Sequence, residues 1–133
     1  MIANINTRRR GEIIIIEAGD PLDPGRCATN LREKISELAE LGNRWILLDM
    51  SGVTALDSKA ARDLVLAGAS MAMMSGDVKL MNVCRSLQES LASARLDRLF
   101  EAFGGEQAAI QSMEMAKAAH LRIAARRRES YWG

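Results

Sequence analysis

The sequence predicts an α/β protein of one domain, with a mixed sheet of four or five strands and helices packed mainly on one face. An unbroken apolar run, Trp45 to Met50, is typical of a strand buried on both faces inside a parallel or mixed sheet. Apolar stripes at helical spacing lie on either side of it, so strands and helices alternate along the chain. With 133 residues, 48% of them hydrophobic, the chain can bury one core.

The amino-terminal part is expected to form an antiparallel hairpin. Its strands would be Met1 to Asn6 and the isoleucine-rich run Glu12 to Glu17, and residues 7–11, with three arginines, would be the turn. Both prolines of the chain mark residues 19–25 as a loop. A helix should follow and end at Gly42.

Strands and helices should alternate to the end of the chain. After the apolar run we expect a helix from Asp57-Ser58 to residues 75–76, a strand at 78–83, a short strand within 99–103 and a last helix from about residue 106. Ser86 and Glu89 have capping-box spacing at the start of one further helix. Residues 1–113 would form the domain and residues 114–133 a basic helical extension. Right-handed crossovers place the connecting helices on one face.

The charge distribution excludes some classes of function. The net charge is +1, but residues 117–133 hold five basic residues and one acidic residue, which leaves the other 116 residues at −3. A mildly acidic body argues against direct nucleic-acid binding. No apolar run approaches the ~18 to 20 residues of a membrane span, and no secretory signal opens the chain. We therefore expect a cytoplasmic protein without membrane insertion.

No metal or cofactor is expected. Cys27 and Cys84 lack the spacing of a metal site, and His120 is the only histidine. The sequence also contains neither a G-x-G-x-x-G turn after a strand nor a G-x-x-x-x-G-K-[ST] loop.

Ser58 is the main candidate functional residue. It stands where a strand leads into a helix, beside the carboxyl edge of the sheet, where ligands and partners commonly meet α/β proteins. One interpretation is structural, because Asp57 or Ser58 can cap the helix and stabilise it by ~1 kcal/mol. A catalytic nucleophile would need G-x-S-x-G and a histidine base, whereas the residues here are L-D-S-K-A.

A phosphoacceptor is the other interpretation of Ser58. A phosphate there would add nearly two negative charges beside Asp57. The helix dipole and the free N–H groups of the first turn would tolerate it. Binding could thus be switched without unfolding the domain.

These segments resemble the STAS domain, and most of all the small anti-sigma factor antagonists. The resemblance covers residues 1 to about 113. It rests on the hairpin, the Leu22-Asp23 loop, the stretch ILLDMSGVTALDSKAA and the GDVKLMNV strand that follows. In that family an anti-sigma factor that is also a serine kinase, of the histidine-kinase-like ATPase type, phosphorylates the serine after this aspartate and then releases the antagonist.

The resemblance implies a binding protein and not an enzyme. Ser58 would be the phosphoacceptor, and the partner would contact Asp23, Asp57, Lys59, Ala60 and Ala61. The family pattern commonly continues with serine and glycine where this chain has Lys59 and Ala60. The Lys59 ammonium would partly neutralise a phosphate on Ser58.

Other members of the family leave alternatives open. The chain could be the STAS subunit of an ABC-type lipid-transport complex, a scaffold that is not phosphorylated, or a sensor of a small ligand or nucleotide. The sequence does not specify the oligomeric state.

Overall fold

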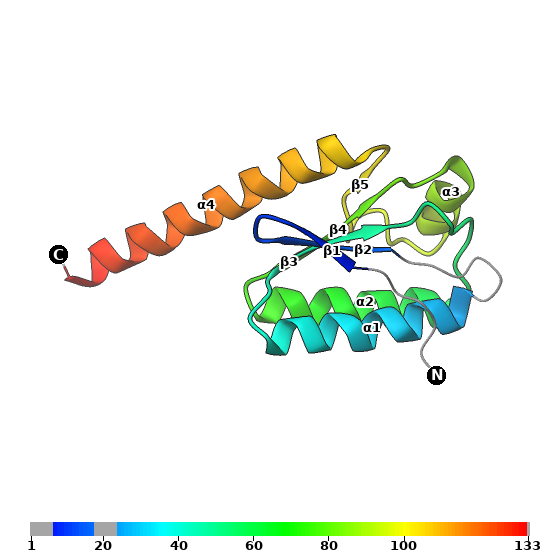
Figure 1. The fold of residues 1–133 in the computed structure, drawn as a ribbon, viewed down its shortest axis with the longest axis horizontal. Helices are drawn as coiled ribbons and strands as arrows, with labels where there is room; N and C mark the ends of the chain where they lie inside the picture. Colours follow the sequence, from blue (N-terminus) through cyan, green and yellow to red (C-terminus); the bar gives the residue numbers. More distant parts are fainter. Residues whose placement is uncertain (1–6, 18–23, 133) are drawn as a thin grey trace.

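The computed structural model describes residues 7–17 and 24–132, which form a five-stranded sheet with four helices (Figure 1). The strands are β1 (Thr7–Arg10), β2 (Ile13–Glu17), β3 (Trp45–Asp49), β4 (Asp77–Met81) and β5 (Ala102–Phe103). They lie side by side in chain order. β1 pairs antiparallel with β2, and all other pairs are parallel. The predicted mixed α/β architecture is confirmed.

The helices are α1 (Pro24–Glu40), α2 (Ser58–Met73), α3 (Arg85–Ser93) and α4 (Glu106–Trp132). The first three connect parallel neighbours, and they cover one face of the sheet, as right-handed crossovers require. α4 covers the other face (Figure 1). No helix within the described residues is long and apolar enough to cross a membrane.

Each face of the sheet has its own core. Alternate residues of β2, β3 and β4 point to opposite faces, because side chains alternate along a strand. On the larger side they pack against α1, α2 and α3 through buried residues that include Ile46, Leu48, Leu64, Met71 and Leu87. On the smaller side Ile13, Ile15, Leu47 and Met81 pack against Ala109 and Met113 of α4.

The turn of the hairpin lies a few residues later in the chain than the arginines suggested. Thr7–Arg10 was expected to be the turn, but it is β1, and the turn lies at Gly11-Glu12, with Gly11 at φ +63°. The arginines belong to the strand because Arg8 and Arg10 share the α4 face, where both bind Glu106. The other predicted strand, Met1 to Asn6, lies outside the described residues.

α4 is fixed to the sheet by polar as well as apolar contacts. The buried Lys79 of β4 donates from Nζ to Ser112 Oγ at 3.0 Å and lies 3.1 Å from Glu101 Oε2. Farther along α4, His120 makes an edge-on ring contact with Trp45, with 6.0 Å between ring centroids. α4 continues as one helix across residue 113, the predicted end of the domain, and projects beyond the sheet (Figure 1).

The sequence suggests an apolar stripe on α2 formed by Ala61, Leu64, Val65, Gly68, Met71 and Ala72, and the buried stripe of the structure differs from it in part. Ala60, Asp63, Leu64, Ala67 and Met71 are the buried residues, whereas Ala72 is exposed. Ala60 and Ala67 are small enough for α2 to lie close to its neighbours, and α1 and α2 make the most extensive helix–helix contact.

Gly76, in the turn between α2 and β4, provides a test of this packing. A methyl group there would collide with the backbone oxygen of Arg44 and would lie 2.8 Å from Met71 Cε. We expect Gly76→Ala to lower the free energy of unfolding by about 2 kcal/mol, because a backbone atom cannot move aside cheaply. Gly104→Ala is the control, since nothing lies within 4 Å of a methyl group at that position. Equal urea midpoints for the two variants would contradict this account.

Candidate functional site

The candidate site is the segment that connects β3 to α2 at the carboxyl edge of the parallel strands. β3 ends at Asp49, Ser51-Gly52 makes a turn, and α2 begins at Ser58. The neighbouring connection, from β4 to α3, leaves the sheet at the same edge because β3 and β4 are parallel. The two connections therefore form one surface.

Asp57, and not Ser58, caps α2. Asp57 has an extended backbone (φ −80°, ψ 175°), and its Oδ1 accepts a hydrogen bond from the Ala60 N–H at 2.7 Å. Ser58 is consequently the first helical residue. Its side chain is exposed, and its hydroxyl forms no hydrogen bond with any residue that the structure describes. Helix capping, one of the two interpretations offered for Asp57 and Ser58, therefore applies to Asp57 alone.

The other predicted site residues take different positions. Lys59 is exposed and Ala61 is half-buried, so both reach the surface beside Ser58. Ala60 has no exposed surface, and its methyl group faces the core. It can shape a partner surface only by holding its neighbours in place. Asp23 lies outside the described residues.

Ser90 of α3 and its N-cap residue Cys84 hold the segment that leads to Ser58. Ser90 Oγ accepts from the Leu56 N–H at 3.1 Å and lies 3.5 Å from the Leu56 carbonyl oxygen, to which it donates. Cys84 Sγ donates to the Val53 carbonyl at 3.7 Å. These contacts fix the backbone immediately before the Asp57 cap. Neither was predicted, because both join residues more than 30 positions apart.

The predicted capping box of α3 is wrong. The helix starts one residue earlier than Ser86, and Cys84 is its N-cap, with Sγ accepting from the Leu87 N–H. Glu89 instead forms an ion pair with Arg85, one turn away on the exposed side of the helix.

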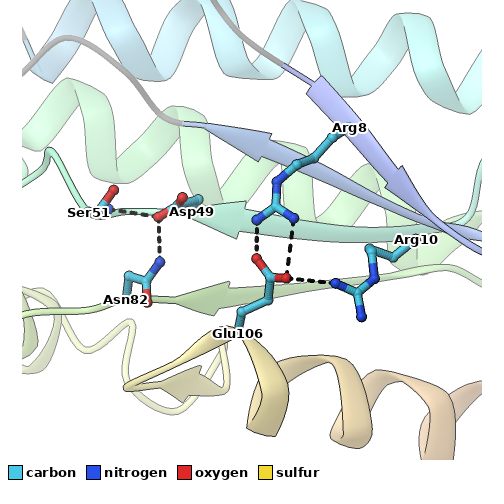
Figure 2. A network of polar contacts seen from close by, with 6 residues as sticks. All are labelled: Arg8, Arg10, Asp49, Ser51, Asn82 and Glu106. Carbon is cyan, nitrogen blue, oxygen red and sulfur yellow. Dashed lines mark hydrogen bonds and ion pairs between the residues drawn. The ribbon is translucent and has the colours of Figure 1, made fainter.

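Asp49 fastens the other end of the segment. Its Oδ1 accepts from the Ser51 N–H at 3.1 Å and from Asn82 Nδ2 at 2.9 Å (Figure 2). Asn82 follows β4 in the left-handed region, at φ +57°, which short amide side chains tolerate. The carboxylate thus ties the turn after β3 to the end of β4.

A second polar cluster joins β1 to the start of α4 near the same edge. Glu106 binds Arg8 through both carboxylate oxygens and Arg10 through Oε2, at 3.1 Å (Figure 2). The hydrogen bond with Arg8 lowers the pKa of Glu106 and raises the pKa of Arg8. The first described strand and the last helix are thereby joined.

The surroundings of Ser58 do not resemble a catalytic serine site. His120 contacts Trp45, the first residue of β3, whereas Ser58 follows the other end of that strand. The imidazole is therefore at the opposite edge of the sheet. The described residues contain no group of three or more histidine, cysteine or acidic side chains placed to hold a metal ion.

A pocket of about 230 Å³ lies beside α2, between Gly68, Ala72, Leu99 and Phe100. It is smaller than the ~300 to 1,000 Å³ usual for small-molecule sites. Gly76 and Asp77 also line it, which places it toward the amino edge of the sheet and away from Ser58.

A family model, STAS domain, matches residues 4–109. Because the match spans most of the chain, the protein belongs to the STAS domain family. A search of curated protein sequences returned no match.

Solved structures of different proteins share the fold. An anti-sigma-factor antagonist (STAS) domain protein from Planctomyces limnophilus is 18% identical, with a TM-score of 0.68 over 84% of this chain and 99% of that chain. A serine-to-glutamate variant of RsbS from Moorella thermoacetica is 12% identical, with a TM-score of 0.73 over 87% and 99%. A sulfate transporter family protein from Wolinella succinogenes is 13% identical, with a TM-score of 0.67 over 82% and 90%. At these identities the likeness establishes the fold alone.

The capping assignment predicts different effects for two adjacent residues. Asp57→Ala should lower the free energy of unfolding by about 1 kcal/mol, because the Ala60 N–H loses its acceptor. Ser58→Ala should change it by less than about 0.5 kcal/mol, since the hydroxyl is exposed and makes no bond within the described part of the chain. Urea unfolding of both variants measures the difference, and a larger loss for Ser58→Ala would reverse the assignment.

The Glu106 cluster predicts a pH-dependent contribution to stability. Because the folded-state pKa of Glu106 is lowered, its contribution is present above the unfolded pKa of ~4.3 and is lost as the pH falls through the folded value. Glu106→Gln should cost up to about 1 kcal/mol at pH 7, since both arginines are partly exposed, and progressively less as the pH falls below the unfolded pKa. Thermal unfolding across this range measures it. Glu40→Gln, an exposed carboxylate on α1, is the control.

Proposed function

We propose that this STAS domain is a regulatory binding protein, an anti-sigma factor antagonist that is switched off by phosphorylation of Ser58. The observation that supports it is the division of roles at the start of α2. Asp57 supplies the helix cap, so the exposed Ser58 hydroxyl has no structural task among the described residues. A kinase can therefore modify it without breaking a hydrogen bond of the fold.

The partner would be an anti-sigma factor that is also a serine kinase of the histidine-kinase-like ATPase type. It would transfer the γ-phosphoryl group of ATP to Ser58 Oγ, with release of ADP and of the hydroxyl proton. Asp57, Lys59 and Ala61 reach the same surface, and the Asp23 loop would complete it. The anchoring of Val53 and Leu56 by α3 supports a preformed surface, which lowers the entropic cost of binding.

A transport role is the second candidate, because the fold likeness extends to a sulfate transporter family protein. In that case the chain would be a subunit of an ABC-type lipid-transport complex, bound to its ATP-binding subunit, and Ser58 would not be modified. The two candidates predict different partners for the same surface.

The experiment is a comparison of Ser58→Asp with Ser58→Ala. Proteins captured from the native cell by the wild type but not by Ser58→Asp are identified, and the affinity of the purified partner is measured. We expect Ser58→Asp to weaken binding at least about tenfold and Ser58→Ala to change it little, because only aspartate adds charge. Ser70→Asp, an exposed position farther along α2, is the matched control.

Incubation with the partner and ATP should add one phosphate, located on Ser58 by mass spectrometry. Equal affinities of Ser58→Asp and Ser58→Ala would refute the switch. Capture of an ABC-type ATPase that binds both variants equally would favour the transport role.

A further inference from the structure

Two exposed basic side chains follow Ser58 in the first turns of α2. Lys59 is the next residue and Arg62 lies four residues on, one helical turn away on the same side as Ser58. Neither forms an ion pair with any residue that the structure describes. Both charges are therefore available to a molecule that approaches Ser58.

Several charged groups of α2 and of the helices beside it already have partners. The Asp57 carboxylate accepts the Ala60 N–H at 2.7 Å. Arg85 lies 3.7 Å from Glu89 on α3, and Arg32 of α1 lies 3.8 Å from Asp63 of α2.

Residues 57–62, the N-cap and first five residues of α2, therefore have a net charge opposite in sign to that of the domain body. Asp57, Lys59 and Arg62 together carry a charge of +1, whereas the 116 residues before position 117 carry −3. This positive surface would therefore attract an acidic partner that the rest of the domain repels.

We propose that Ser58, Lys59 and Arg62 form a charge-reversal surface that docks on an acidic face of the partner. The proposal rests on the proposed function and names the chemistry of the partner at the same site. A phosphate on Ser58 adds about two negative charges at pH 7, which changes the local charge from +1 to about −1. An acidic partner is attracted to the first state and repelled by the second.

Arg62 strengthens the reversal. A phosphate on Ser58 and a guanidinium four residues later form an i,i+4 pair on the helix, and arginine binds phosphate through two parallel hydrogen bonds. The phosphate would then pair with Arg62, whose guanidinium would no longer be available to the partner. The family commonly has a second serine at the position of Lys59. In this chain the lysine makes the net charge of the docking surface positive before Ser58 is phosphorylated.

The first test needs no partner. Protein with phosphoserine incorporated at position 58 during translation is titrated by phosphorus NMR. The second pKa of the phosphate should lie below its ordinary value of about 6 and should rise by about 0.3 units in Lys59→Gln and in Arg62→Gln. Arg98→Gln is the control, an exposed arginine outside α2 whose neighbour Leu99 lines the pocket with Gly76 and Asp77, away from Ser58. Unchanged titrations in both test variants would overturn the proposal.

The second test uses the purified partner captured by wild type but not by Ser58→Asp. Lys59→Glu and Arg62→Glu should each weaken binding of the unphosphorylated protein by roughly three- to tenfold, and Arg98→Glu should have no effect. The difference should shrink between about 0.05 and about 0.5 M NaCl, because salt screens exposed charges. Lys59→Gln and Arg62→Gln, which remove a positive charge without adding a negative one, should each weaken binding less than the corresponding glutamate variant.

Unchanged or tighter binding of the charge-reversed variants would overturn the acidic docking face, even with Ser58→Asp still released. That result would leave the phosphorylation switch standing, so the two proposals fail separately. Should no partner distinguish Ser58→Asp from wild type, the proposed function and the docking face fail together. The phosphorus titration would then still decide whether Lys59 and Arg62 neutralise the phosphate.

Discussion

Ile46, Leu47 and Leu48 of β3 have no exposed surface, and they alternate between the two faces of the sheet. A strand covered on both faces needs a neighbour on each side, and β2 and β4 pair with β3 in parallel. Parallel pairing requires long crossovers, here α1 and α2. Each crossover helix begins at the carboxyl edge, which puts Ser58 there. The location of the candidate site therefore follows from the burial of one short strand.

In the proposed function, stability and signalling depend on different side chains at the start of α2. Asp57 makes the hydrogen bond on which the first turn depends, and Ser58 makes none within the described residues. A phosphate on the first helical residue also interacts favourably with the helix dipole. Because Ser90 and Asp49 hold the segment on either side, the added charge has little freedom to rearrange the backbone. The phosphate would therefore act on a partner bound to this surface and not on the fold of the domain.

The sequence predicted β3 and α2 well because both depend on local patterns, an apolar run and a polar pair before a helical stripe. It could not decide between Asp57 and Ser58 as the cap, because either side chain can accept the bond and the choice depends on which backbone is extended. The arginines of β1 looked like a turn because their partner, Glu106, is 98 residues beyond Arg8. Ser90 was missed for the same reason. Arg62 could have been found from its i+4 spacing to Ser58.

The basic carboxyl-terminal part of the chain raises the question of which charges set the field at Ser58. α4 starts near the carboxyl edge, where Glu106 binds Arg8, and runs past Trp45 at the amino edge (Figure 1). At 1.5 Å per residue, Arg126 lies about 30 Å along the helix from Glu106. Exposed charges separated by more than the ~8 Å Debye length of physiological salt are largely screened from one another. The arginines at the far end of α4 therefore contribute little to the field at the carboxyl edge, where Ser58 lies.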